Sequence, residues 1–104
     1  MTKIKIGNVI LGDNEPCFTI AEAGANHDGS LEKALKLIDA AKESKVNSIK
    51  FQTYKASKLT TKSAPKYWDD GKNEETQFDV FSKLDGLTND NWNEIFEYAK
   101  KRDI

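Results

Sequence analysis

The chain has 104 residues, of which 38% are hydrophobic and 32% are charged, and its formal net charge is −1. A chain of this length supports one small domain with a thin core. Acids and bases alternate without a block of one sign, so the composition argues against nucleic acid and membrane surfaces as partners.

Cysteine content and apolar runs indicate the compartment. Cys17 is the single cysteine, so it has no partner for an internal disulfide, which is typical of a reducing, cytoplasmic environment. The first residues lack the apolar run of a signal peptide, and no stretch approaches the ~20 apolar residues of a membrane span.

A hairpin and a buried strand are predicted at the beginning of the chain. Within residues 3–11, β-prone runs lie before and after Gly7 and Asn8. A Gly-Asn pair between two such runs is a signal for a hairpin with a two-residue turn. Residues 12–16 have the composition of a turn. Residues 18–22 are β-prone without polar alternation, as expected for a strand covered on both faces.

A helix and a second strand follow. Residues 30–44 place apolar side chains at helical spacing, with Ser30 as the expected N-cap. Residues 47–53 form the next β-prone run. The order strand, helix, strand predicts a right-handed parallel βαβ unit and therefore an α/β fold.

The rest of the chain is predicted to contain a long loop and two helices. Residues 54–74 are polar, and a loop of this length inside a compact unit is typically functional or disordered. Its aromatic residues argue against disorder. Helices are expected over 75–84 and 88–102, the second with Thr88 as its N-cap.

Polar side chains stand where the two parallel strands end, the edge at which α/β proteins bind ligands. Side chains of a strand alternate between its two faces. This places Glu22 at the end of an apolar face of the first strand, and Lys50 and Gln52 together on one face of the second strand. A salt bridge at a strand end and a solvated edge strand are the simple explanations. The functional alternative is a general base beside a cation for an anionic substrate, with an amide for hydroxyl groups.

The intervening loop carries Asn26 and His27, the single histidine. His27 is either a hydrogen-bonded structural residue or a functional group, and with Asp28 alone it makes no metal site of recognisable spacing. Asn26 either satisfies loop backbone groups or contacts a sugar. The spacing of Gly24 and Gly29 is not a dinucleotide-binding fingerprint.

Three segments carry a resemblance to a known family. Residues 20–30 read IAEAGANHDGS, residues 49–54 read IKFQTY, and residues 62–68 read KSAPKYW. Together they resemble the N-terminal part of the N-acetylneuraminate (sialic acid) synthase family, and the resemblance covers essentially the whole chain.

The resemblance implies the N-terminal portion of a (β/α)8 TIM barrel preceded by a β-hairpin. It implies a transferase of sialic acid biosynthesis that condenses phosphoenolpyruvate with an N-acyl amino sugar such as N-acetylmannosamine, forming a nonulosonic acid. It also implies a divalent metal, Mn or Mg, with ligands in later strands, and a homodimer when the protein is full length.

The resemblance also assigns roles to individual residues. Glu22 matches an active-site glutamate, and Lys50 is carried over with it as catalytic. The residues carried over as substrate-binding, the last of them a sugar-contacting asparagine, are Gln52, Asn26, His27 and Asn73.

The chain is short for the family that it resembles. A (β/α)8 barrel needs about 250 residues, so we expect a front fragment, inactive as an isolated polypeptide of 104 residues. The alternative is a non-catalytic small α/β binding or assembly module. The sequence leaves open whether the sugar belongs to the sialic, legionaminic or pseudaminic acid route.

Overall fold

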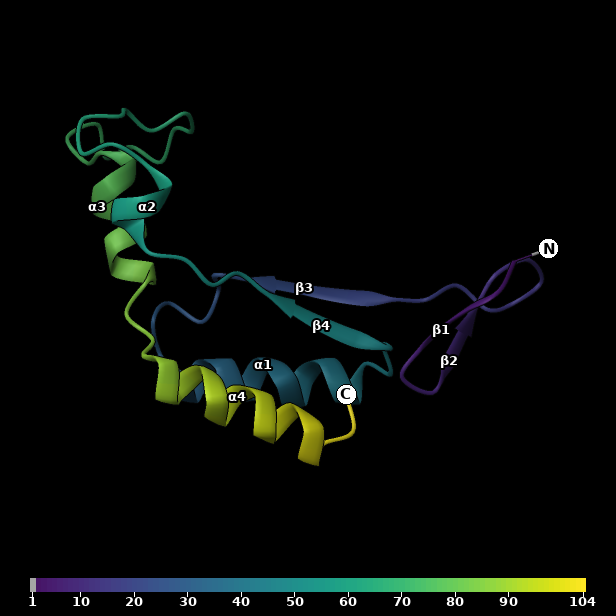
Figure 1. The fold of residues 1–104 in the computed structure, drawn as a ribbon. Coiled ribbons are helices and arrows are strands. Elements are labelled where there is room, and N and C mark those ends of the chain that lie inside the picture. Colours follow the sequence, from purple (N-terminus) through teal and green to yellow (C-terminus); the bar gives the residue numbers. More distant parts are fainter. Residues whose placement is uncertain (1) are drawn as a thin grey trace.

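The computed structural model describes residues 2–104, which form a hairpin, a parallel strand pair, two helices along one side of that pair and two helices beyond the ends of its strands (Figure 1). The elements in chain order are β1 (Ile4–Ile6), β2 (Val9–Leu11), β3 (Ile20–Gly24), α1 (Leu31–Glu43), β4 (Ser48–Phe51), α2 (Ala56–Leu59), α3 (Gln77–Leu84) and α4 (Asn89–Lys101).

The hairpin lies within the predicted range of residues 3–11. β1 pairs antiparallel with β2, so that Ile4 lies opposite Leu11. Gly7 turns the chain at a φ of +56°, a conformation that costs glycine little. In Figure 1 the hairpin lies near the start of β3, far from the end of the strand pair that carries the polar residues.

β3 and β4 pair in parallel, as the strand–helix–strand order predicts. The ladder begins at Ile20 opposite Ser48, two residues later than the predicted strand over 18–22. Thr19 lies before the ladder and is hydrogen-bonded to Asn47, whose Oδ1 accepts from the Thr19 N–H at 2.8 Å. β3 runs on to Gly24, and β4 ends at Phe51, inside the predicted range of 47–53.

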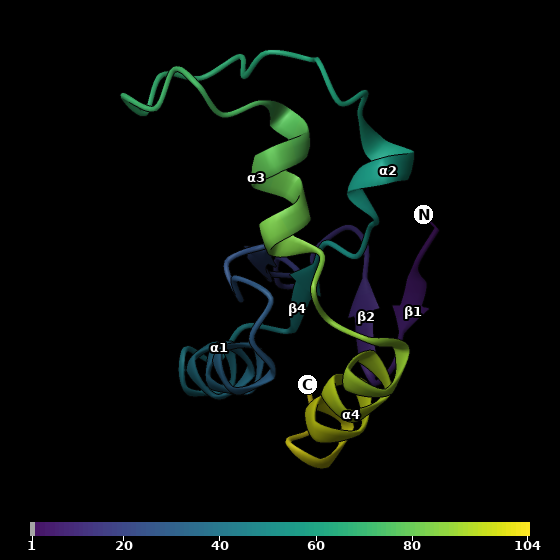
Figure 2. The same cartoon turned by 90° about the vertical axis from the view of Figure 1, so that its left-hand side faces the viewer.

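α1 and α4 cover one face of the strand pair (Figures 1 and 2). Both begin at the predicted caps, Ser30 and Thr88, whose side chains accept from main-chain N–H groups in the first turn. None of the helices formed by residues 2–104 is long and apolar enough to cross a membrane. The fully buried residues between the layers are Ala34, Ile38, Leu87 and Ile95.

The segment predicted as a loop over 54–74 contains a short helix, α2, so that prediction was wrong in part. The helix begins because the Asp85 carboxylate accepts from the Ala56 N–H at 2.8 Å. This cap comes from a residue far along the chain, where local sequence gives no signal. Tyr54 then packs against Phe81 of α3, with ring centroids 5.6 Å apart.

The second face of the β3–β4 pair is open. The radius of gyration is 16.9 Å, compared with about 13 Å for a compact domain of this size. Ile20 on this face is 56% exposed, whereas Ala23 on the helix side is buried. Residues 2–104 therefore form an open layer in which one side of the strand pair is bare.

Candidate active site at the strand ends

A carboxylate and an ammonium meet on the open face. Glu22 and Lys50 are partners in the parallel register, and the Lys50 Nζ lies 2.9 Å from the Glu22 Oε2. Their side chains are 51% and 61% exposed. The predicted convergence of these two groups is confirmed as geometry, while their catalytic roles stay predictions.

The amide of Gln52 joins this pair across Gly24. The register of the strands shifts between Glu22 and Gly24, and the Gln52 N–H donates to the Gly24 carbonyl at 3.0 Å. A β-carbon built on Gly24 would lie 3.4 Å from the Glu22 Oε1 and 3.7 Å from the Gln52 Nε2. Both side chains therefore pass over the space that this glycine leaves free.

The three side chains form one polar cluster that is open to ligands, and we call Glu22, Lys50 and Gln52 the strand-end cluster. It offers an anion, a cation, and an amide that both donates and accepts. A cation beside an amide suits a substrate that carries both a phosphate or carboxylate and hydroxyl groups. The carboxylate is able to orient a hydroxyl or to take a proton.

His27 does not join the strand-end cluster. Its side chain is 1% exposed and packs on the helix-covered side of the sheet. The ring centroid lies 5.6 Å from that of Trp92 and 6.2 Å from that of Phe51. A ring in this position has no access to a ligand on the open face, which argues against the substrate-binding role predicted for His27.

Burial makes the folded protein sensitive to acid through His27. Burial lowers the pKa of His27 below its ordinary 6.5, while the Gln52 main chain and Asp28 oppose part of this effect. The unfolded chain therefore binds a proton at a pH where the folded chain does not, so stability is full above about pH 6.5 and falls below it.

We expect the free energy of unfolding of the full-length protein to fall between about pH 6.5 and pH 5, where ordinary carboxylates remain ionised. In His27→Gln this slope is expected to be smaller, because the titrating group is gone. Urea unfolding of both proteins at several pH values measures the difference. Parallel pH profiles for the two proteins would contradict the assignment.

Asn26 satisfies the main chain of its own loop. Its Nδ2 donates to the Ala23 carbonyl at 2.9 Å, and its own N–H donates to the same oxygen at 3.0 Å. The side chain lines a shallow hollow with Lys33 and Lys36 of α1, apart from the strand-end cluster. This contact is the structural alternative that the sequence left open.

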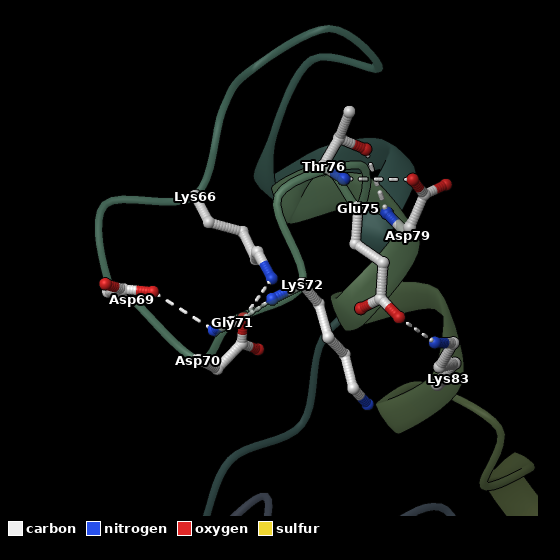
Figure 3. A network of polar contacts seen from close by, with 9 residues as sticks. All are labelled: Lys66, Asp69, Asp70, Gly71, Lys72, Glu75, Thr76, Asp79 and Lys83. Carbon is white, nitrogen blue, oxygen red and sulfur yellow. Dashed lines mark hydrogen bonds and ion pairs between the residues drawn. The ribbon is translucent and has the colours of Figure 1, made fainter.

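A network of polar contacts orders the loop between α2 and α3 (Figure 3). Lys66, whose side chain is 5% exposed, forms an ion pair with Asp70. This pair and the Lys72 N–H lower the pKa of Asp70 to about 2. Glu75 pairs with Lys83 of α3 at 3.0 Å. The loop is therefore ordered by its own charges as well as by its aromatic residues.

Asn73, the predicted sugar-contacting residue, lies exposed in this loop. In the part of the chain that the structure describes, it makes no side-chain hydrogen bond to the strand-end cluster. The sequence analysis also missed Asp85, which caps α2 through Ala56 and whose carbonyl accepts from the Lys55 Nζ at 3.1 Å. An acidic residue next to Gly86 at the end of a predicted helix was the available signal.

The residues present do not fit a metal centre. Among residues 2–104 there is no group of three or more His, Cys, Asp or Glu side chains that could hold an ion. The His27 Nδ1 already accepts from the Gly29 N–H at 2.9 Å, and its ring is surrounded by aromatic side chains.

A parallel βαβ unit places this chain among the α/β proteins, the class in which the carboxyl ends of the strands are the usual ligand-binding edge. Residues 37–104 match the model of the NeuB family. Because this match covers more than half of the chain, the chain belongs to the NeuB family.

Named relatives agree with this assignment. The N,N'-diacetyllegionaminic acid synthase of Legionella pneumophila is 51% identical over 55 residues, which are 53% of this chain and 15% of that protein. The pseudaminic acid synthase of Campylobacter jejuni is 48% identical over 60 residues, which are 58% of this chain and 17% of that protein.

A solved structure covers nearly the whole chain. The N-acetylneuraminic acid (sialic acid) synthetase of Leptospira borgpetersenii aligns with a TM-score of 0.74 and 33% identity, covering 99% of this chain and 32% of that one. The chain thus spans a third or less of the length of these relatives.

Proposed function

We propose that the chain is the front part of a nonulosonic acid synthase that condenses phosphoenolpyruvate with an N-acyl amino sugar. The observation that carries this proposal is the strand-end cluster, in which a carboxylate, an ammonium and an amide converge on one open face. Membership of the NeuB family and relatives named as sialic, legionaminic and pseudaminic acid synthases support it.

The reaction joins the methylene carbon of phosphoenolpyruvate to the aldehyde carbon of the open-chain sugar. Water then attacks the oxocarbenium-like carbon, and phosphate leaves. In this scheme Lys50 balances the carboxylate or phosphate charge, Gln52 binds sugar hydroxyl groups, and Glu22 orients a hydroxyl or takes a proton. The divalent metal implied by the resemblance would be held by residues outside this segment, because residues 2–104 offer no site for it.

The bare surfaces support a barrel that continues beyond β4. An apolar groove of about 530 Å³ runs between β4 and α4 and is lined by Phe51, Trp92 and Phe96. Phe96 is 71% exposed, and Ile20 on the open face is 56% exposed. A further strand beside β4 would cover the groove, and a closed barrel would enclose Ile20. We therefore expect residues 1–104 alone to have no synthase activity.

The decisive experiment is a coupled phosphate-release assay on the full-length protein. The candidate sugars are the N-acyl amino sugars of the sialic, legionaminic and pseudaminic acid routes, each with phosphoenolpyruvate. We expect phosphate release with one of them and none when either substrate is omitted. Absence of release with every sugar would contradict the synthase and favour a non-catalytic binding or assembly module.

Gly24 gives a prediction with a matched control. Both Gly24 and Gly7 have a positive φ, +55° and +56°, but a β-carbon on Gly7 meets nothing within 4 Å. Alanine at either position is expected to cost about 1–2 kcal/mol of stability, because both force an L-residue into the left-handed region.

Gly24→Ala alone is expected to lower turnover, by up to about tenfold, because its methyl group would lie in van der Waals contact with Glu22 and Gln52 and restrict the movement of their side chains. Urea unfolding and the phosphate-release assay measure the two effects separately. Equal turnover in Gly24→Ala and Gly7→Ala would show that the free space over Gly24 does not matter.

A further inference from the structure

Gln52 lies one residue beyond the end of β4, where regular pairing with β3 has stopped. Its N–H is held by the Gly24 carbonyl at 3.0 Å. Its own carbonyl lies beyond Phe51, the last paired residue of β4, so the ladder does not hold it. A hydrogen bond to the main-chain carbonyl of Gln52 would therefore help to fix the position of the Gln52 side-chain amide in the strand-end cluster.

The buried ring of His27 packs against Phe51, the residue before Gln52, with ring centroids 6.2 Å apart. Its Nδ1 accepts from the Gly29 N–H, so the proton of the neutral ring is on Nε2. The Nε2 atom is buried and, among residues 2–104, has no partner at standard hydrogen-bond geometry. The Gln52 main chain is also one of the influences that raise the His27 pKa against the effect of burial.

The surroundings of His27 leave the ring little freedom. The ring is held edge-on against Trp92 of α4 and tilted against Phe51 of β4. Its main-chain carbonyl accepts from the N–H of Ser30, the cap of α1, at 2.9 Å. His27 thus connects the loop after β3, the start of α1, the end of β4 and α4.

We propose that His27 is a positioning residue, whose Nε2–H donates to the main-chain carbonyl of Gln52 and so fixes the Gln52 amide in the strand-end cluster. It does so from the helix-covered side and touches no substrate. With Gly24 on the N–H and His27 on the carbonyl, both main-chain groups of Gln52 are held where the sheet no longer holds them. A buried polar atom is thereby also satisfied.

The consequence for catalysis rests on the proposed function. Gln52 is the group proposed to bind the hydroxyl groups of the amino sugar, so loss of the His27 contact should weaken use of the sugar and leave the KM for phosphoenolpyruvate nearly unchanged. A small displacement of a substrate-positioning group is sufficient to lower the rate considerably.

Two substitutions in the full-length protein separate the two ring nitrogens. Asn places an acceptor near the Nδ1 position and keeps the bond to Gly29, but its side chain is too short to reach Gln52. Gln extends a donor to the Nε2 position. We expect His27→Asn to lower kcat/KM for the sugar by about tenfold and His27→Gln to remain much closer to wild type, with phosphate release as the assay.

Measurements without turnover test the contact itself. Hydrogen exchange over residues 49–54 is expected to be faster in His27→Asn than in His27→Gln or wild type. In the wild-type protein, the ¹⁵N spectrum of the His27 ring is expected to show the Nε2–H tautomer with a slowly exchanging ring proton.

An Nδ1–H tautomer or a charged ring near neutral pH would overturn the proposal even if both variants failed to fold. Equal kinetics and equal exchange in His27→Asn and His27→Gln would also overturn it. A wild-type protein without synthase activity would contradict the proposed function instead, and the exchange and ¹⁵N measurements would still decide the role of His27.

Discussion

Glu22→Gln is expected to lower the turnover of the full-length enzyme by at least about tenfold, because a positioned carboxylate that orients a hydroxyl or moves a proton contributes strongly to rate. Glutamine keeps the size and the hydrogen-bonding oxygen of Glu22 but removes its charge and basicity. The phosphate-release assay measures the change, and urea unfolding measures stability in the same preparation.

The stability of the variant is expected to change little. The Glu22–Lys50 pair is about half exposed on both sides, and exposed ion pairs contribute only about 0–1 kcal/mol. A large loss of turnover with a small loss of stability would therefore come from chemistry at the open face rather than from unfolding.

α1 supplies a matched control. Glu32 and Lys36 form an exposed pair at 2.8 Å, similar in chemistry and distance to Glu22 and Lys50 but remote from the strand ends. Glu32→Gln is expected to keep full turnover. If Glu22→Gln and Glu32→Gln were equally active, Glu22 would be no more than a member of a surface ion pair.

The convergence of Glu22 and Lys50 could be predicted from sequence because two simple regularities determine it. Strand residues alternate between faces, and a βαβ unit makes its strands parallel. Ile49 and Phe51 are apolar and point to the helices, so Lys50 has to point to the other face. No long-range contact had to be known for this prediction.

Other features depended on contacts between distant residues and were not predictable in the same way. α2 begins because Asp85, 29 residues further on, binds the Ala56 N–H. β3 continues past Glu22 through a register shift at Gly24, where only the structure shows which side chains share the free space. His27 sits in a polar loop motif, yet its ring is buried by Trp92 of a helix predicted separately.

The same contrast explains why Asn26 and His27, both predicted to bind substrate, lie away from the strand-end cluster. Asn26 and His27 lie in a motif rich in reactive groups, and a motif does not say which side of the sheet a loop residue faces. The structure directs Asn26 to the Ala23 carbonyl and His27 into the core. For loop residues, orientation is set by turns such as the positive φ of Asp28, which local sequence specifies only weakly.

Lys50→Met is expected to raise the KM for phosphoenolpyruvate and to lower kcat/KM by at least about tenfold, because it removes a cation aimed at an anionic substrate while keeping an unbranched side chain. In the same variant, kcat/KM is expected to depend less on salt concentration, since a charge interaction with the substrate has been lost. Steady-state kinetics at two ionic strengths measure both effects, with Lys36→Met as the control.

The double variant Glu22→Gln/Lys50→Met separates structure from chemistry. If the two residues served only to pair with each other, removing both would restore the turnover that either single substitution loses, since no unpaired charge would remain. If both act on substrate, the double variant is expected to be at least as impaired as the worse single variant. Because the pair is exposed and contributes little to stability, the kinetic comparison reports on the open face of the strand pair.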